Sequence, residues 1–303
     1  MRVLVTGANG YIGRTVVAML NEAGHEPVAM VRAQGMPIVG AAEVRTADLL
    51  DSESMRRVVG DVDAVCHLAA ITRARESFAE PMRYFRVNTG GTISLLEAME
   101  AADVPRIVFA STGAIYGTPE RQPMDEQVPD APPHPYASSK LAAELAIEAQ
   151  ARGGHLAAII LRIPNIAGGS DPDLTRLVPR AIAAAADQTA LPVNGNGSAV
   201  RDYLHIQDAA DAFVECLEHL PEAGQAIRYN IGSGHGASVM DIVAAVERVS
   251  GRHVELEHRP PAPEPAKLIN DPSKAIAEIG WSPRRSDIDG IVRDAWSASV
   301  AAL

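Results

Sequence analysis

The chain has 303 residues, of which 47% are hydrophobic and 21% are charged. This balance is typical of globular proteins and excludes a disordered or fibrous chain. Thirty-eight acidic residues against 27 basic ones give a net charge of −11, which argues against binding to a nucleic-acid backbone. No apolar run approaches the roughly 20 residues of a membrane helix, so we expect no membrane span.

Short β-rich segments alternate with helical segments through the first half of the chain. Strands separated by helices require crossover connections, which give a parallel sheet covered by helices on both faces. The predicted fold is therefore α/β with a doubly wound, Rossmann-type sheet. The expected strands are 3–5, 28–31, 43–46, 64–68, 106–110 and 155–163, and the expected helices are 11–23, 51–59, 80–101 and 136–152.

In the second half of the chain, strands and helices alternate less regularly. Six prolines within 118–135 exclude a helix or a central strand, so we expect an ordered loop over a cleft or a plain connector. We expect residues 1–164, with segments near 202–232, to form a Rossmann domain, and residues 165–303 to form mainly a smaller, interleaved substrate-binding lobe. Further expected elements are helices 174–186, 207–220 and 239–249, strand 227–231, turns at 164–172 and 194–198, and a proline-dense stretch at 260–265.

The first residues enter a predicted strand at once, which leaves no room for a signal peptide and favours a cytoplasmic location. The two cysteines, Cys66 and Cys216, are too few for a disulfide framework. Each stands in an apolar stretch, so we expect buried free thiols. The nine histidines show no metal-binding spacing, and we expect no metal.

The segment TGANGYIG at 6–13 follows the first strand and opens the first helix. Gly7 permits a tight turn, Gly10 lets the backbone approach a pyrophosphate, and Gly13 lets the helix pack closely on the sheet. The anion then lies at the positive end of the helix. This context predicts a dinucleotide site.

The end of the second strand distinguishes NAD from NADP, because an acidic residue there binds the ribose hydroxyls. This chain has Arg32 after Val31 and no acid. The planar fork of Arg32 matches a 2′-phosphate, although a solvated surface arginine fits equally. We therefore predict NAD and leave NADP open. Asp48 and Leu49, after the third strand, are placed to contact adenine.

Tyr136 and Lys140 lie four residues apart, so they share one face of a helix. A free phenol titrates near ~10, but a nearby ammonium and a positive nicotinamide ring both lower that pKa. Tyr136 then removes a hydroxyl proton while a hydride leaves the same carbon, and Lys140 also holds the nicotinamide ribose. Thr112, at the end of a predicted strand, hydrogen-bonds the reacting oxygen or serves as a turn hydroxyl.

Taken together, these motifs resemble the extended short-chain dehydrogenase/reductase superfamily and its NAD-dependent epimerase/dehydratase family. The resemblance covers essentially the whole chain and is strongest to nucleotide-sugar epimerases of the UDP-glucose 4-epimerase type. The further motifs that fit are HLAA at 67–70, FASTGAIYG at 109–117, YASSK at 136–140, VRDYLHIQDAADA at 200–212 and YNIGSG at 229–234.

By this resemblance, Thr112, Tyr136 and Lys140 form the catalytic triad. Asn165 meets the nucleotide, Arg201 and Arg259 pair with the substrate diphosphate, and Thr112 also touches the substrate. The implied cofactor contacts are Gly7, Asn9, Gly10, Tyr11, Ile12, Gly13, Arg32, Asp48, Leu49, Leu68, Ala69, Ala70, Asn88, Tyr136, Lys140 and Ile163. The resemblance also implies a homodimer through helices 80–101 and 136–152, whose apolar residues equally suit burial within one monomer.

The leading hypothesis is a nucleotide-sugar 4-epimerase, of the UDP-glucose/UDP-galactose type, with a tightly bound nicotinamide cofactor. Oxidation at C4 is transient, the 4-keto sugar turns over in the pocket, and the hydride returns to the other face. Gly113 and Ala114 stand where the 4,6-dehydratases of the superfamily carry Asp-Glu, which argues against dehydration. The alternatives are an NADP(H)-dependent ketoreductase acting on a nucleotide-linked keto sugar or another carbonyl, favoured by Arg32, and a non-enzymatic dinucleotide-binding sensor.

Overall fold

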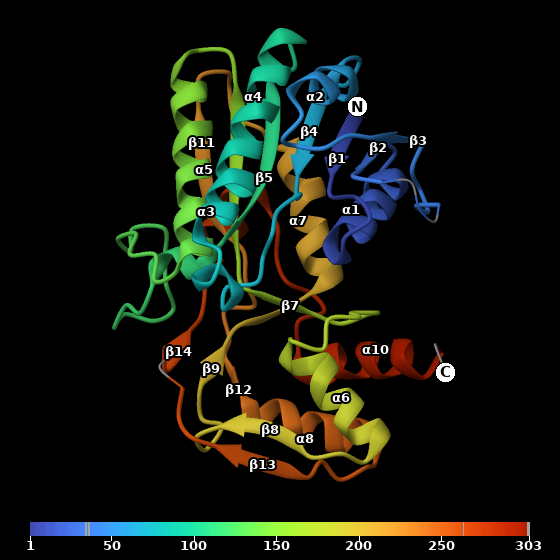
Figure 1. Cartoon of the computed structure of the whole chain (residues 1–303), viewed down its shortest axis with the longest axis vertical. Helices are drawn as coiled ribbons and strands as arrows, with labels where there is room; N and C mark the ends of the chain where they lie inside the picture. Colours follow the sequence, from blue (N-terminus) through green and yellow to red (C-terminus); the bar gives the residue numbers. More distant parts are fainter. Residues whose placement is uncertain (34, 36, 263, 302–303) are drawn as a thin grey trace.

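The computed structural model describes residues 1–33, 35, 37–262 and 264–301, and its largest feature is a parallel sheet of seven strands (Figure 1). The strand order β11-β6-β5-β4-β1-β2-β3 confirms the predicted doubly wound α/β class. The strands are β1 (Arg2–Thr6), β2 (Glu26–Val31), β3 (Glu43–Thr46), β4 (Ala64–His67), β5 (Arg106–Thr112), β6 (Ala157–Ile163) and β11 (Ala226–Asn230).

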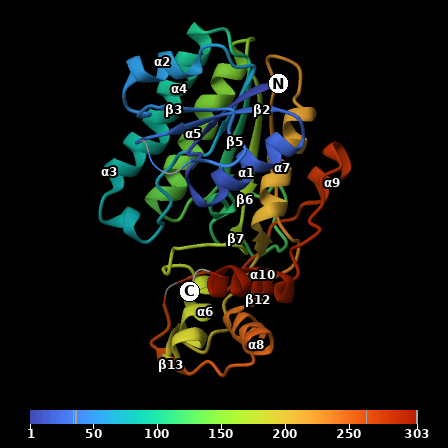
Figure 2. The ribbon, with the colours of Figure 1, turned by 90° about the vertical axis from the view of Figure 1, so that its right-hand side faces the viewer.

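Helices cover both faces of this sheet, as Figures 1 and 2 show. Side chains alternate along a strand, so Val3 and Val5 join the core beneath one helical layer while Leu4 joins the core beneath the other. The first layer is α1 (Tyr11–Glu22) and α7 (Ile206–Glu218), and the second is α2 (Ser52–Val59), α4 (Gly91–Ala101) and α5 (Pro135–Arg152). Cys66 and Cys216 are buried free thiols in the first core, as expected.

The helix predicted over 80–101 is not uniform. It is divided into α3 (Pro81–Tyr84), a π-helical turn η2 (Phe85–Gly90) and α4. A π-turn inserts one residue into the hydrogen-bond ladder and rotates the side chains that follow, which a hydrophobic pattern does not reveal. The turn contains Asn88, one of the predicted cofactor contacts.

A smaller lobe lies beyond the carboxyl ends of the sheet (Figure 1). Its core is formed by apolar residues of α6 (Leu177–Asp187), α8 (Val239–Ser250) and α10 (Ile288–Ala301). Its short strands are β8 (Leu191–Asn194) paired with β13 (Leu256–Arg259), and β9 (Val200–Arg201) paired with β12 (Ala237–Ser238) and β14 (Lys267–Leu268). In the described part of the chain, no helix combines the length and apolar character needed to span a membrane.

The chain crosses between the two regions more than once. The segment 164–172, expected to be only a turn-rich loop, contains β7 (Asn165–Ala167), which pairs with β10 (Tyr203–His205). The chain then returns through α7 and β11 to the sheet, as the interleaving predicts. The exact domain division stays a prediction. The remaining elements are the 3₁₀ turns η1 (Glu76–Phe78) and η3 (Gly113–Tyr116), and α9 (Ser273–Ile279).

Candidate active site

The predicted catalytic and cofactor residues gather where the parallel strands end. β1, β4, β5 and β6 all finish at the edge that faces the smaller lobe (Figure 1). In open α/β sheets, this carboxyl edge is where ligands bind. The structure therefore brings together the glycine turn after β1, the HLAA segment after β4 and Thr112 at the end of β5.

The glycine turn has no room for side chains. Gly7 has φ +69°, and a Cβ atom on it would lie 2.9 Å from the backbone nitrogen of Ala69. A Cβ on Gly13 would lie 2.2 Å from the carbonyl oxygen of Gly7. Helix α1 starts at Tyr11 with Gly10 as its N-cap, and no side chain caps its first N–H groups. This arrangement fits the pyrophosphate of a dinucleotide, because free N–H groups and the helix dipole both attract an anion.

Thr6 joins the glycine turn to the HLAA segment, a role that the sequence did not reveal. Its Oγ1 accepts hydrogen bonds from the backbone N–H groups of Leu68 and Ala69, both at 3.1 Å, and lies 2.7 Å from Nδ1 of His67. Burial, followed by the charge of Lys140, lowers the pKa of His67 to about 3, so this imidazole is neutral. Leu68, Ala69 and the adjacent Ala70 stay partly exposed beside the turn.

Asn88 is fully engaged by the protein. Its Oδ1 accepts a hydrogen bond from the N–H of Ile71 at 2.9 Å, and its Nδ2 donates to the Ile71 carbonyl and to Oγ of Ser139, both at 3.0 Å. These bonds fix the segment after the HLAA motif against α5. Direct contact of Asn88 with the cofactor stays a prediction.

The predicted triad comes from two elements. Thr112 ends β5, and its Oγ1 accepts a hydrogen bond from the N–H of Ala114 at 3.2 Å. Tyr136 and Lys140 stand in the first two turns of α5, which begins at Pro135 with His134 as its N-cap. Thr112 and Lys140 are buried, while Tyr136 is partly exposed.

Burial dominates the ionisation of this triad. It raises the pKa of Tyr136 to about 12, although a hydrogen bond from Thr112 and the charge of Arg176 act in the opposite direction. It also lowers the pKa of Lys140 to about 7, while Glu144 acts to raise it. The Nζ atom of Lys140 lies 4.0 Å from the centre of the Phe109 ring. The surrounding protein groups therefore do not lower the pKa of this phenol, and the lowering expected from Lys140 and the nicotinamide ring stays a prediction.

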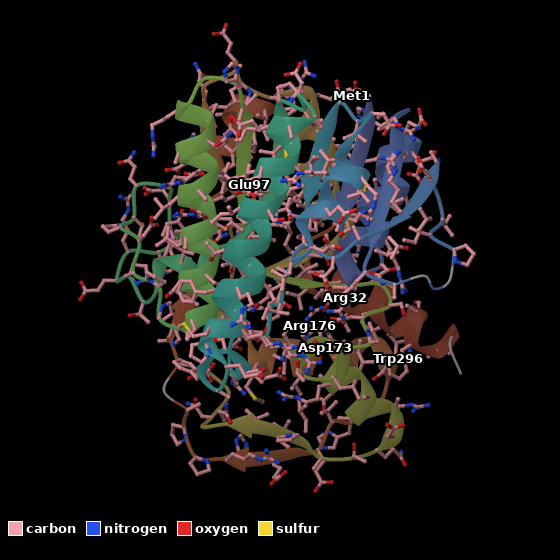
Figure 3. All side chains as sticks on the ribbon, turned by 45° about the horizontal axis from the view of Figure 1, so that its top comes forward. Met1, Arg32, Glu97, Asp173, Arg176 and Trp296 are labelled. Atoms are coloured by element: carbon pink, nitrogen blue, oxygen red, sulfur yellow. The ribbon has the colours of Figure 1, made fainter. Side chains whose placement is uncertain are left out.

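The remaining predicted cofactor residues surround the same edge. Arg32 is exposed directly after β2 (Figure 3), and Asp48 is exposed after β3 with its carboxylate accepting the N–H of Leu50 at 2.9 Å. Leu49 is buried beside Gly91 of α4, and Tyr11 donates a hydrogen bond to the carbonyl of Gly168. Asn9, Ile12 and Ile163 lie in the glycine turn, in α1 and at the end of β6, respectively.

The predicted substrate residues lie beyond the edge, where each arginine already has protein partners. Asn165 is exposed at the start of β7. Arg201 donates from Nη1 to the carbonyls of Val200 and Pro265, each at 2.8 Å, and Nη2 pairs with Glu264 at 3.0 Å. Arg259, exposed on β13, donates to Glu257 at 3.2 Å.

Arg180 of α6 was not expected from the sequence. Its Nε is buried and has no hydrogen-bond partner among the described residues. Burial lowers its pKa, and the nearby charges of Arg75 and Arg259 lower it further. The charges of Arg75 and Arg259 thus both act on Arg180. The three arginines come from distant segments, so no sequence motif indicates this cluster.

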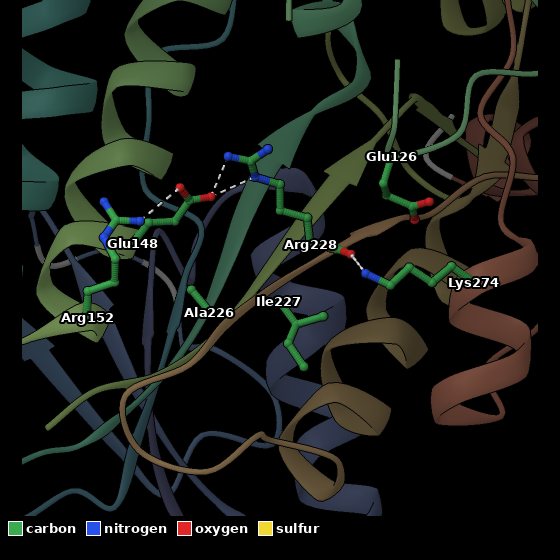
Figure 4. Close-up of a pocket in the computed structure, with 7 residues that line it drawn as sticks. All are labelled: Glu126, Glu148, Arg152, Ala226, Ile227, Arg228 and Lys274. Atoms are coloured by element: carbon green, nitrogen blue, oxygen red, sulfur yellow. Dashed lines mark hydrogen bonds and ion pairs between the residues drawn. The ribbon is translucent and has the colours of Figure 1, made fainter. Parts of the chain in front are cut away.

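A separate surface cavity of about 430 Å³ lies along β11 at the sheet border (Figure 4). Its charged groups already satisfy one another: Arg228 pairs with Glu148 at 2.5 Å, and Lys274 donates to the carbonyl of Arg228 at 2.9 Å. It shares no residue with the predicted site, and we assign it no ligand.

The fold and the strand-end site together define a Rossmann-type protein whose glycine turn is shaped for a dinucleotide. Comparison with known proteins agrees. The model of the NAD dependent epimerase/dehydratase family matches residues 3–232. A UDP-glucose 4-epimerase from Azospirillum brasilense is 35% identical, over 99% of this chain and 92% of its own length.

Solved structures extend the similarity. A UDP-glucose-4-epimerase from Stenotrophomonas maltophila, with bound NAD and formylated UDP-arabinopyranose, superposes with a TM-score of 0.93 at 32% identity, covering 100% of this chain and 98% of that one. MoeE5 in complex with UDP-glucuronic acid and NAD gives 0.92 at 27% identity, covering 100% of both chains. The chain belongs to the NAD dependent epimerase/dehydratase family, as the sequence motifs implied. Its curated relatives are enzymes, which confirms an enzyme and disfavours the sensor.

Proposed function

We propose that the protein is a nucleotide-sugar 4-epimerase that uses tightly bound NAD, with UDP-glucose and UDP-galactose as its substrate pair. The observation that carries this proposal is the position of Thr112 at the end of β5 and of Tyr136 and Lys140 in the first turns of α5, in a chain similar over its whole length to UDP-glucose 4-epimerases. Fold alone would not specify the chemistry.

Residues around the glycine turn would hold NAD in this proposal. Gly7, Gly10 and Gly13 leave room for the pyrophosphate at the N-terminus of α1, and the exposed carboxylate of Asp48 would meet the adenosine. Lys140 would hold the nicotinamide ribose. When bound, NAD supplies a reversible hydride acceptor for C4 of the sugar.

The triad handles the proton that accompanies the hydride. Tyr136, as phenolate, takes the C4 hydroxyl proton while the C4–H bond breaks and its electron pair leaves as hydride. Thr112 hydrogen-bonds the oxygen that becomes a carbonyl, and the ammonium of Lys140 stabilises the phenolate. After the keto sugar has turned over, the hydride returns to its other face and Tyr136 gives the proton back. The cycle has no net oxidation.

A diphosphate would satisfy the arginines around Arg180. Arg180 carries a buried, unpartnered Nε beside Arg75 and Arg259, an arrangement that is costly until an anion neutralises it. Bidentate pairing with phosphate oxygens is the contact that guanidinium groups make best. These residues support a nucleoside-diphosphate sugar and leave the sugar itself to be determined.

A second candidate rests on Arg32, which is exposed after β2, where its guanidinium could pair with a 2′-phosphate. It is an NADP(H)-dependent ketoreductase that uses the same triad for net reduction of a nucleotide-linked keto sugar. The two candidates differ in whether the cofactor is consumed.

The test is to incubate the purified protein with UDP-galactose, without added cofactor, and to follow UDP-glucose. Conversion to an equilibrium mixture, lost in Tyr136→Phe although NAD remains bound, supports the epimerase. Conversion of UDP-glucuronic acid but not of UDP-galactose would retain the 4-epimerase and change the sugar. Consumption of added NADPH, with no epimerisation of either sugar, would favour the reductase.

We also propose a homodimer through α4 and α5. Ile93 and Leu145 on these helices are 43% and 50% exposed, and Met82 of the adjoining α3 is 64% exposed. Apolar side chains exposed together mark an interface. Light scattering should give twice the 32.0 kDa chain mass, and Leu145→Glu should give the monomer mass. A cytoplasmic location stays a prediction, to be checked by cell fractionation.

A further inference from the structure

A buried ion pair lies behind the predicted triad. Glu144 of α5 and Arg162 of β6 are both 0% exposed. Nε of Arg162 donates to Oε1 of Glu144 at 3.1 Å and Nη2 donates to Oε2 at 2.6 Å, so the contact is bidentate. The hydroxyl of Ser111 donates to the same Oε1 atom. Such a pair is strongly destabilised when one partner alone is removed.

This pair is connected to both elements of the triad. Glu144 follows Lys140 by four residues, so it lies one helical turn further along the same face of α5. Ser111 directly precedes Thr112 and pairs in register with Arg162 across β5 and β6. The carboxylate of Glu144 therefore hydrogen-bonds β5 next to Thr112 and also lies near Lys140 on α5.

We infer that Glu144, held by Arg162 and Ser111, is a positioning residue that keeps Lys140 protonated, so that its ammonium can stabilise the phenolate of Tyr136. This inference rests on the proposed function of Tyr136. It assigns Glu144 no contact with substrate or cofactor.

The charges around Lys140 single out Glu144. His67 faces Lys140 from β4 and is neutral, since its pKa is lowered to about 3, and the Phe109 ring faces it from β5. Among the described residues, Glu144 is the charged group that acts to raise the pKa of Lys140 against the effect of burial.

Charged and titratable groups also surround Tyr136 and Glu144. The pKa of Tyr136 is influenced by the hydroxyl of Thr112, by Arg176 at the N-cap of α6 and by Tyr84 of α3. Glu144 is approached, besides Arg162, by Arg228 of β11, whose Nε is 3.6 Å from Oε2. Asp130 of the proline-rich loop lies 2.7 Å from Nη1 of Arg162, on the side away from Glu144's own oxygens.

The consequence concerns the charge of Lys140. Only the ammonium form of this side chain can stabilise a phenolate on Tyr136. A carboxylate one turn from Lys140 favours the ammonium. Loss of the carboxylate lowers the pKa of Lys140, and the neutral amine that results no longer stabilises the base.

Glu148 provides a matched control. It is the next carboxylate on α5, one turn beyond Glu144, and it also pairs with an arginine, Arg228, at 2.5 Å (Figure 4). It stands eight residues beyond Lys140, about two helical turns away. Glu148→Gln therefore removes a neighbouring, partly exposed ion pair on the same helix while leaving Glu144 beside Lys140.

The experiment compares Glu144→Gln, Glu144→Asp and Glu148→Gln as NAD-loaded enzymes. For each we would record the pH profile of kcat and the near-ultraviolet phenolate absorbance of Tyr136, obtained as the difference from Tyr136→Phe in the same background. For Glu144→Gln we expect the alkaline limb to move down by about one pH unit and kcat to fall about tenfold, because one pKa unit is a tenfold change in protonation ratio. The phenolate signal at neutral pH should fall in parallel.

Glu144→Asp keeps the negative charge, so its pH profile of kcat and its phenolate absorbance should lie close to those of the wild type. Glu148→Gln should match the wild type in both measurements. An unchanged profile and phenolate signal in Glu144→Gln would overturn the inference and leave a purely structural ion pair. If the wild type does not epimerise, the phenolate measurement still tests Glu144 independently of the proposed function.

Ser111→Ala covers the case in which Glu144→Gln does not fold. This variant keeps the ion pair but removes one hydrogen bond from the carboxylate, so the carboxylate acts more strongly on Lys140. The phenolate signal should then rise, and the alkaline limb should move to higher pH by a fraction of a unit. An unchanged or opposite shift would overturn the inference.

Discussion

Substitution of Gly13 by alanine tests the glycine turn as the NAD site. The new Cβ would lie 2.2 Å from the Gly7 carbonyl oxygen and 2.9 Å from Cα of Ala8, both backbone atoms that cannot rotate away. Ordinary contact begins near 3.4 Å, so α1 must move from the turn by about 1.2 Å. Overpacking of this kind costs about 1–3 kcal/mol. If this cost falls on the NAD-bound state, NAD binds roughly 5- to 150-fold more weakly.

The assay is NAD released by heat from purified protein, together with calorimetric affinity on the apo form and a thermal unfolding curve. Gly60→Ala is the control, because a Cβ on Gly60 meets nothing within 4 Å and its φ is −57°. We expect wild-type NAD content in Gly60→Ala and depleted NAD in Gly13→Ala. Full NAD retention with unchanged affinity in Gly13→Ala would refute the assignment of this turn to the pyrophosphate.

Other substitutions test the arginine cluster and a buried carboxylate. Arg180→Gln should raise KM for the nucleotide sugar about 10- to 100-fold with little change in kcat, since a lost charged hydrogen bond costs about 1.5–3 kcal/mol. The control is Arg121→Gln, because Arg121 is exposed. A KM for Arg180→Gln equal to that of the wild type would show that Arg180 does not bind the substrate. Burial raises the pKa of Asp202 to about 6, so the folded protein binds its proton more tightly than the unfolded chain does. Stability contributed by this group is therefore present at low pH and lost as the pH rises from about 4 to 6, by up to about 3 kcal/mol. The free energy of unfolding, measured with denaturant as a function of pH, should fall less between pH 4 and 6 in Asp202→Asn than in the wild type. An identical pH dependence in the two proteins would contradict a raised pKa for Asp202.

Local motifs could be recognised because their meaning depends on near neighbours in the chain. The glycine spacing at 6–13 fixes a turn, and the four-residue spacing of Tyr136 and Lys140 fixes one helix face, whatever surrounds them. Most strands of the central sheet were also predictable, because they are buried apolar segments between helices, whereas β3 (Glu43–Thr46) is short and largely exposed. For the same reason, the six strands and covering helices of the first half lie close to their predicted positions.

Short pairings and buried charges were decided by the tertiary structure. Strands such as β7 and β9, of three and two residues, have no periodicity of their own and exist because β10, β12 and β14 lie beside them. Thr6 gave no sign in the sequence that it would bind the backbone after β4.

Charged residues illustrate the difference most clearly. In the sequence, Glu144 and Arg180 are indistinguishable from solvated surface residues, and nothing near Arg162 in its apolar strand indicates which group it pairs with. The fold buries Glu144 and Arg162 against each other and leaves the Nε of Arg180 without a partner near two other arginines. The sequence by itself determined the class of fold and the residues able to do the chemistry. Only the tertiary structure decided which charges surround them, because electrostatic energy depends on distance and burial in space rather than on separation along the chain.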